Sequence, residues 1–174
     1  MKTLAEHLIQ YSHYHRVKQN ILTHFVGIPL ILIALLSLLS VPLWQQPLLT
    51  PALLLWLVSS VFYWLLDWRF GLTMLLLHGI CLALAQQLAQ LPTTAWLGWS
   101  AALFIFGWLL QFIGHYFEGR KPAFVDDISG LLIGPLFVVA ELAFKLGLRP
   151  ELAGEIIAAA GPERPWRQQV PPQA

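Results

Sequence analysis

Charged residues are scarce in this chain of 174 residues, at 11% of the total against about 25% in an average soluble domain. A single cysteine, Cys81, excludes an intrachain disulfide, and a formal net charge of +1 excludes a surface that tracks nucleic-acid phosphates. Hydrophobic residues make up 57% of the chain, with 8 Trp and 10 Phe among them. This composition also excludes a disordered chain, and it requires a non-aqueous neighbour.

Two long stretches contain no Lys, Arg, Asp or Glu. They cover the 48 residues between Lys18 and Asp67 and the 48 residues between Arg69 and Glu118. Because a membrane-spanning helix needs about 20 apolar residues, each stretch has room for two spans and a turn, and each carries Pro and Gln near its middle. We therefore predict an all-α, polytopic membrane helical bundle with four transmembrane helices in two hairpins. The predicted spans are 21–41, 51–66, 70–89 and 95–114.

A weaker apolar segment follows at 128–148. Its sequence is compatible with a fifth span, a re-entrant piece or a helix lying in the membrane interface. Residues 1–148 are predicted to form a single membrane-embedded domain. Residues 149–174 are predicted to form a short helix and a flexible, Pro-rich tail.

The cations of the short loops predict how the chain is oriented. All of them fall on one side of the four predicted spans, and the turns on the other side have none. The cations concerned are Lys2, Arg16, Lys18, Arg69, Arg120 and Lys121. By the positive-inside rule this side, with the N-terminus, is cytoplasmic. The compact loops and the absence of a targeting signal favour a bacterial inner membrane over the endoplasmic reticulum of a eukaryote.

Histidines gather at the same predicted face. His15 precedes the first span, His24 lies in its first turn, and His115 lies at the end of the fourth span. Imidazole is the commonest nitrogen ligand for iron, zinc and copper, and ionisable groups at membrane depth usually serve a function. The sequence therefore predicts a metal site formed by these three residues. His13 and His78 are possible extra ligands.

Helical spacing tests this ligand set. His15 and His24 are nine residues apart, which puts them on opposite sides of a continuous helix. If both bind one ion, the helix must break between them, and Arg16–Gln19 is the expected place. If the helix is continuous, His13 replaces His15 as the partner of His24.

Two segments carry a family resemblance. The first runs from Tyr14-His15 to His24, and the second is the stretch QFIGHYFEGRKPA at 111–123. On these motifs, the chain from about 11 to 148 resembles the family of yeast-type 2-hydroxy fatty acid dioxygenases, which act in phytosphingosine breakdown. The resemblance implies an Fe2+-dependent membrane enzyme that removes the carboxyl carbon of a long-chain 2-hydroxy fatty acid with O2. It also implies His15, His24 and His115 as the iron ligands.

The neighbouring polar residues suggest further roles at such a centre. Arg120 or Lys121 is expected to hold the substrate carboxylate, because a cation there matches its charge. Glu118 is expected to act as a fourth ligand, as a base for the hydroxyl proton, or as the partner that orients His115. Asn20 is expected to contact the substrate.

Two other classes of protein remain open on the sequence alone. One is a membrane scaffold without catalysis, in which the histidines are incidental. The other is a different His-ligated metalloprotein, with haem or zinc. The sequence has no phosphate-binding glycine loop, no HExxH, no CxxC and no serine nucleophile elbow.

Overall fold

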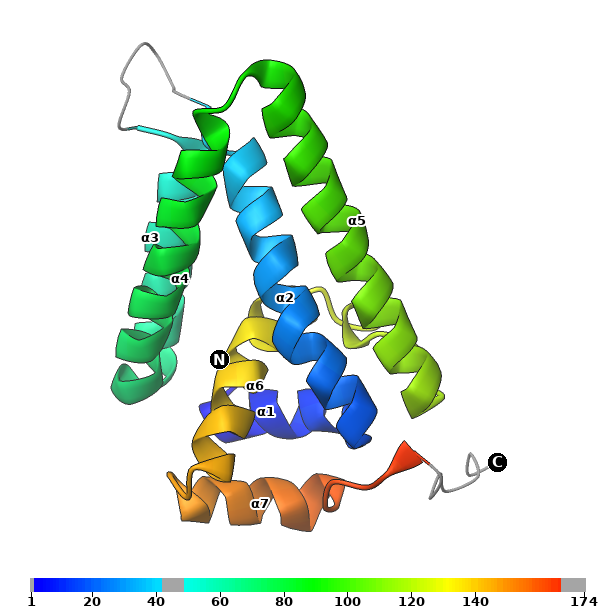
Figure 1. Ribbon diagram of the computed structural model, residues 1–174. Helices are drawn as coiled ribbons and strands as arrows, with labels where there is room; N and C mark the ends of the chain where they lie inside the picture. The colour runs from blue at the N-terminus through cyan, green and yellow to red at the C-terminus, as the bar shows by residue number, and fades with distance from the viewer. Residues whose placement is uncertain (1, 42–48, 167–174) are drawn as a thin grey trace. The chain divides into compact units, whose positions relative to one another are not determined.

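The computed structural model describes residues 2–41 and 49–166, and the regular elements within them are helices (Figure 1). In chain order they are α1 (Leu4–Ser12), α2 (Lys18–Leu38), α3 (Pro51–Leu66), α4 (Trp68–Ala89), α5 (Thr93–Glu118), the 3-10 helix η1 (Ala123–Val125), α6 (Gly130–Lys145) and α7 (Pro150–Ala160). The chain divides into two compact units, Met1–Val26 with Leu109–Ala174 and Gly27–Trp108. The turn predicted near 42–48 and the tail from 167 lie outside the described residues.

In the second unit, α3 and α4 form a tight antiparallel hairpin (Figure 1). Asp67 ends α3 and caps α4, because its carboxylate accepts hydrogen bonds from the amides of Arg69 at 3.0 Å and Phe70 at 3.1 Å. Gly71 permits the close approach, since a Cβ there would lie 2.6 Å from the Cα of Trp64. The bounds of α3 match the predicted span 51–66.

The apolar faces of these helices confirm a helical membrane bundle. Three helices, α2, α4 and α5, are long and apolar enough to cross a membrane, and α3 is a shorter apolar helix of 16 residues. Val58, Leu65 and Ile105 each expose more than half of their surface. Such a density of exposed apolar side chains requires lipid as the solvent.

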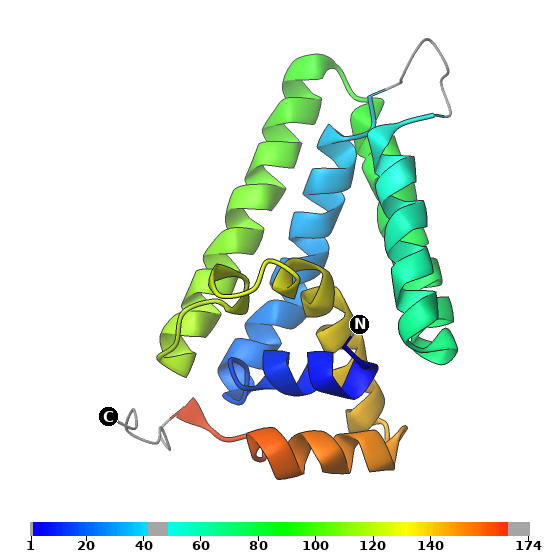
Figure 2. The same cartoon turned by 180° about the vertical axis from the view of Figure 1, so that it is seen from behind.

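In the first unit, α1 packs against α6 and α7 (Figure 2). The contact buries Leu8 of α1, Phe137 of α6 and Ile156 of α7. Helix α6 ends at Lys145, and the chain then bends by 113° into α7. Gly147 makes this turn with a φ of 74°, and the amide of Leu148 donates back to α6. The segment predicted at 128–148 is therefore a helix that stops short of 148, and the short helix predicted after 149 is α7.

Helices α2 and α5 approach closely at Gly114. A Cβ at this position would overlap the side chains of Asn20 and Thr23 on α2. We expect Gly114→Ala to destabilise the protein by about 1–3 kcal/mol, because overpacking forces the helices apart. Gly98→Ala on the same helix is the matched control, since nothing lies within 4 Å of its Cβ position, and alanine there adds helix propensity. Unfolding midpoints in detergent measure both, and equal midpoints would contradict the predicted contact.

Candidate metal centre

If His15 and His24 bind one ion, the helix must break between them, and the structure has such a break. Helix α1 ends at Ser12 and α2 begins at Lys18, and residues 13–17 between them are not helical. The break therefore lies slightly before the predicted Arg16–Gln19. Lys18 and Gln19 already belong to α2.

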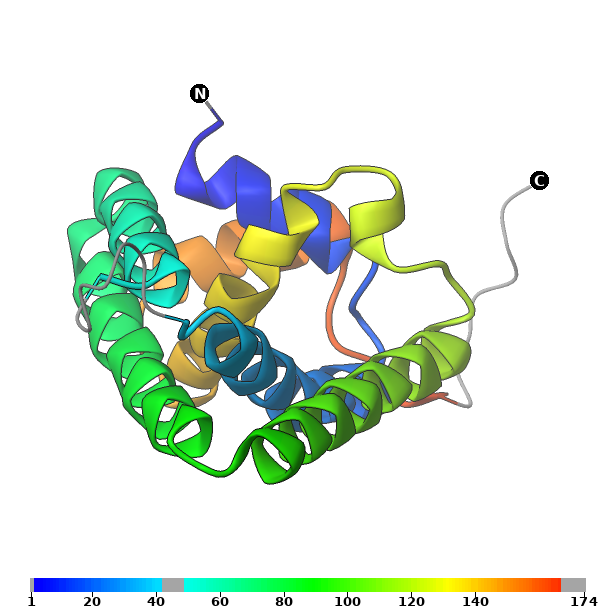
Figure 3. The same cartoon turned by 90° about the horizontal axis from the view of Figure 1, so that it is seen from above.

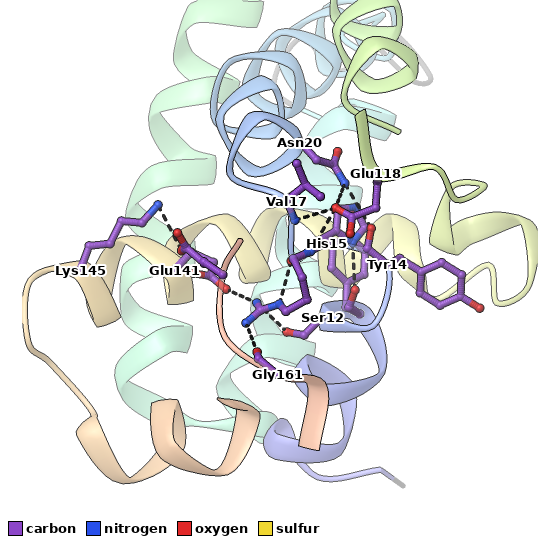
Figure 4. Close-up of polar contacts among 12 residues, drawn as sticks. Ser12, Tyr14, His15, Val17, Asn20, Glu118, Glu141, Lys145 and Gly161 are labelled. Carbon is purple, nitrogen blue, oxygen red and sulfur yellow. Dashed lines mark hydrogen bonds and ion pairs between the residues drawn. The ribbon is translucent and has the colours of Figure 1, made fainter. Parts of the chain in front are cut away.

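Glu118, the last residue of α5, holds this break in place (Figure 4). Its Oε2 accepts hydrogen bonds from the backbone amides of Arg16 at 3.1 Å and Val17 at 2.8 Å. The same oxygen accepts one from Nδ2 of Asn20 at 3.0 Å. A carboxylate from about 100 residues further along the chain therefore holds the two residues that precede α2 and the Asn20 side chain in the first turn of α2.

Three histidines converge beside this break. His15, His24 and His115 each offer one ligand nitrogen, and these nitrogens all lie within 4.8 Å of one another. Their exposed fractions are 0%, 1% and 6%. The break supplies His15, the first turns of α2 supply His24, and the end of α5 supplies His115, so all three belong to the first unit.

Backbone carbonyls fix the tautomers of two of the rings. Nδ1 of His15 donates to the carbonyl of Tyr11 at 2.9 Å, and Nδ1 of His24 donates to the carbonyl of Asn20 at 2.9 Å. A carbonyl oxygen only accepts, so each Nδ1 carries the proton and each Nε2 of the neutral ring presents a lone pair. Those two Nε2 atoms lie 3.0 Å apart. Burial, followed by the nearby His24 and His115, lowers the pKa of His15 well below its usual value, so this ring stays neutral at pH 7.

The arrangement fits a bound metal ion. Two lone pairs facing each other at 3.0 Å repel unless a cation lies between them. Two nitrogens held about 2.1 Å from one ion and at right angles are about 3.0 Å apart. Nδ1 of His115 is also buried and has no hydrogen-bond partner among the residues that the structure describes. The backbone hydrogen bonds on His15 and His24 are the kind that orient metal-ligating imidazoles.

An aromatic wall encloses His15. The Tyr11 ring stacks on its imidazole with centroids 4.1 Å apart and planes 1° apart. Phe137 packs against both rings at 4.9 and 5.4 Å. These contacts limit rotation of the imidazole and exclude water from this side.

Comparison with known proteins decides the family. A family model described as "2-hydroxy-palmitic acid dioxygenase Mpo1-like" matches residues 1–146. The chain belongs to the Mpo1-like family. It is 37% identical over 146 residues to the 2-hydroxy-palmitic acid dioxygenase MPO1 of Saccharomyces cerevisiae, an alignment that covers 82% of this chain and 80% of the yeast protein. No solved structure is significantly similar. The resemblance carried by the two sequence motifs is thus confirmed, and the three histidines lie within the matched region.

Two predicted extra ligands of this Mpo1-like protein are not part of the cluster of three. His13 is exposed, in the turn after α1. His78 lies on α4 in the second unit, where its ring meets Tyr63 with centroids 5.5 Å apart.

Of the residues expected to hold the substrate, Arg120 and Lys121 lie in the loop after α5, and Asn20 lies on α2. Nη1 of Arg120 donates to the carbonyl of His13 at 2.8 Å, and Lys121 pairs with Asp126 at 2.6 Å. Both cations are exposed. Asn20 is buried and its Nδ2 also donates to the carbonyl of Tyr14. Their roles toward substrate stay predictions, as does a catalytic role for Glu118.

Sequence reasoning missed a buried ion pair next to the centre. Nη2 of Arg16 lies 2.7 Å from Oε1 of Glu141, and both side chains are about 95% buried (Figure 4). Nε of Arg16 also donates to the carbonyl of His15 at 2.9 Å. A signal was available, because an acidic residue within an apolar helix such as α6 needs a buried partner.

Proposed function

We propose that this protein is an iron(II)-dependent dioxygenase of the membrane that shortens a long-chain 2-hydroxy fatty acid by one carbon. The facing lone pairs of His15 and His24, with His115 beside them, support a bound metal. Membership of a family named for 2-hydroxy-palmitic acid dioxygenase activity supports the substrate class and the use of O2. No described feature favours haem or zinc over iron.

The three imidazoles would hold the ion and leave coordination positions open for substrate and O2. Bound ferrous iron would supply the redox chemistry with O2. Nδ1 of His15 and Nδ1 of His24 each donate a hydrogen bond to a backbone carbonyl, so their Nε2 lone pairs stay available for a metal ion. Glu118 fixes the backbone between these two ligands by accepting the amides of Arg16 and Val17.

Arg120 is the candidate for the substrate carboxylate. It is exposed at the end of α5, five residues after His115, and its guanidinium uses Nη1 for the His13 carbonyl. The planar fork of an arginine suits a carboxylate. Lys121, which is already paired with Asp126, is the alternative. The acyl chain would lie along the apolar helices, in the lipid.

The reaction balances without a further reductant. A 2-hydroxy acid loses four electrons when its carboxyl carbon leaves as CO2 and its C2 becomes a carboxyl group. One O2 accepts those four electrons, so the products are the shortened fatty acid, CO2 and one water. The stoichiometry expected is one O2 consumed for each fatty acid shortened.

The direct test uses purified protein in detergent with 2-hydroxypalmitate. Protein loaded anaerobically with Fe2+ is expected to consume O2 and release a fatty acid of one carbon fewer, measured with an oxygen electrode and by mass spectrometry. Chelation of the iron is expected to stop both, and fresh Fe2+ to restore them. A product of unchanged length, or turnover that persists after complete metal removal, would refute the proposal.

A further inference from the structure

The segment after α7 runs alongside the helix break that carries His15. Residues 161–166, here called the C-terminal strap, lie beside residues 16–18 (Figure 3). Val17 and Arg164 form a parallel β-bridge. The amide of Arg164 donates to the carbonyl of Arg16 at 2.8 Å, and the amide of Lys18 donates to the carbonyl of Arg164 at 3.0 Å. The strap therefore holds this backbone through the Arg16 carbonyl and the Lys18 amide, which Glu118 does not use.

Side chains add to this backbone pairing. Nη2 of Arg164 lies 3.4 Å from Oε1 of Glu118, whereas Oε2 of Glu118 accepts the amides of Arg16 and Val17. Nη1 of Arg16 donates to the carbonyl of Gly161 at 3.2 Å. The Trp166 ring meets Phe117 with centroids 5.7 Å apart. The strap thus contacts both elements that position the histidines, the break and the end of α5.

Burial makes the charge of Arg164 significant. The Glu118 side chain is 0% exposed, whereas Arg164 is 26% exposed. Among the described residues, Arg164 is the cation that forms an ion pair with this buried carboxylate. A buried carboxylate without a cation is costly, so loss of the Arg164 charge would weaken the hold of Glu118 on the amides of Arg16 and Val17. The strap lies beyond residue 146, where the family match ends.

We propose that the C-terminal strap positions the metal centre, with Arg164 as a positioning residue that acts through Glu118 on the His15–His24 segment. The proposal rests on the proposed function, because it assumes that the three histidines hold a metal. Arg164 pairs with Glu118, Glu118 accepts the amides of Arg16 and Val17, and these contacts keep His15 facing His24. Residues 161–166 follow the region that the family model matches. They would in this way support the three histidines, which lie within that region.

The test measures metal affinity rather than turnover. Full-length Arg164→Gln, Arg164→Lys and wild-type proteins are titrated with Co2+, whose visible absorption reports binding by histidine. We expect Arg164→Gln to bind Co2+ up to about 10-fold more weakly, because Arg164 is one step further from the ion than a direct partner of a ligand, whose loss costs about 10–100-fold. Arg164→Lys keeps the charge and is expected to recover most of the affinity. Glu155→Gln, an exposed change on α7, is the control and should bind as wild type.

A second measurement uses only the wild-type chain and stays informative if Arg164→Gln does not fold. Coupling between metal and strap is reciprocal, so Co2+ should slow hydrogen exchange of the amides of residues 161–166 as well as those of 13–20. Unchanged exchange in the strap, or wild-type affinity in Arg164→Gln, overturns the positioning role. Absence of Co2+ binding by the wild type would instead refute the metal centre itself.

Discussion

Alanine at His24 is expected to lower O2 consumption with 2-hydroxypalmitate by more than about 100-fold. Loss of an outer partner of a metal ligand already costs about 10–100-fold, and His24 is itself a proposed ligand. Its Nε2 lies 3.0 Å from that of His15, and its side chain is buried. Initial rates at saturating Fe2+ measure the loss. Alanine at His15 or His115 is expected to have the same effect.

His13→Ala is the matched control for this series. His13 is also a histidine in the first unit, two residues from His15, but its side chain is exposed. The hydrogen bonds of His13 with Arg120 and Ile9 use its backbone carbonyl and amide, which alanine keeps. We expect activity within about twofold of wild type. Loss of activity in His13→Ala with retention in His15→Ala would mean that the continuous-helix ligand set is correct and the one described here is not.

Glu141→Ala is expected to destabilise the protein by about 3–5 kcal/mol, the usual cost of removing one partner of a buried ion pair. The change leaves the Arg16 guanidinium buried without its carboxylate. Arg16 is also bonded to the carbonyl of His15, so metal affinity should fall together with stability. Unfolding in detergent, followed by circular dichroism, measures the first effect.

A partly exposed ion pair between α6 and the C-terminal strap gives the comparison. Lys145 of α6 lies 3.5 Å from Glu163, and its side chain is 43% exposed. Surface pairs of this kind contribute about 0–1 kcal/mol, so Lys145→Ala should change stability little. The double variant Arg16→Met with Glu141→Leu should recover most of the loss, because it removes both buried charges. Equal unfolding midpoints for Glu141→Ala and Lys145→Ala would contradict the buried pair.

Local patterns in the sequence predicted the helices well. Charge-free length and turn chemistry located α3 at its observed bounds and α4 within two residues at its start. They placed the end of the fourth span at 114, whereas α5 continues to Glu118. The four additional residues, 115–118, include His115 and Glu118, so both of these residues belong to the helix. The helix continues past the predicted end of the span, and its last residue, Glu118, accepts the amides of Arg16 and Val17.

The meeting of His15 and His24 was predictable for a related reason. The nine-residue spacing of His15 and His24 demanded a break if both bind one ion, and the structure has that break at 13–17. What holds the break was not predictable. The contacts of Glu118, Glu141 and Arg164 with residues 16–18 join segments about 100 or more residues apart. No local periodicity reports such contacts, because they depend on how the helices pack. The cytoplasmic N-terminus and the compartment stay predictions.

Metal analysis of the purified protein tests the shared centre most directly. Wild type reconstituted with Fe2+ and passed through a desalting column should retain about one iron per chain, measured by mass spectrometry of the metal. His115→Ala, made at the ligand furthest along the chain from the other two, should retain almost none while keeping its helical circular dichroism. Equal iron in the two proteins, or none in the wild type, would contradict a metal held jointly by His15, His24 and His115.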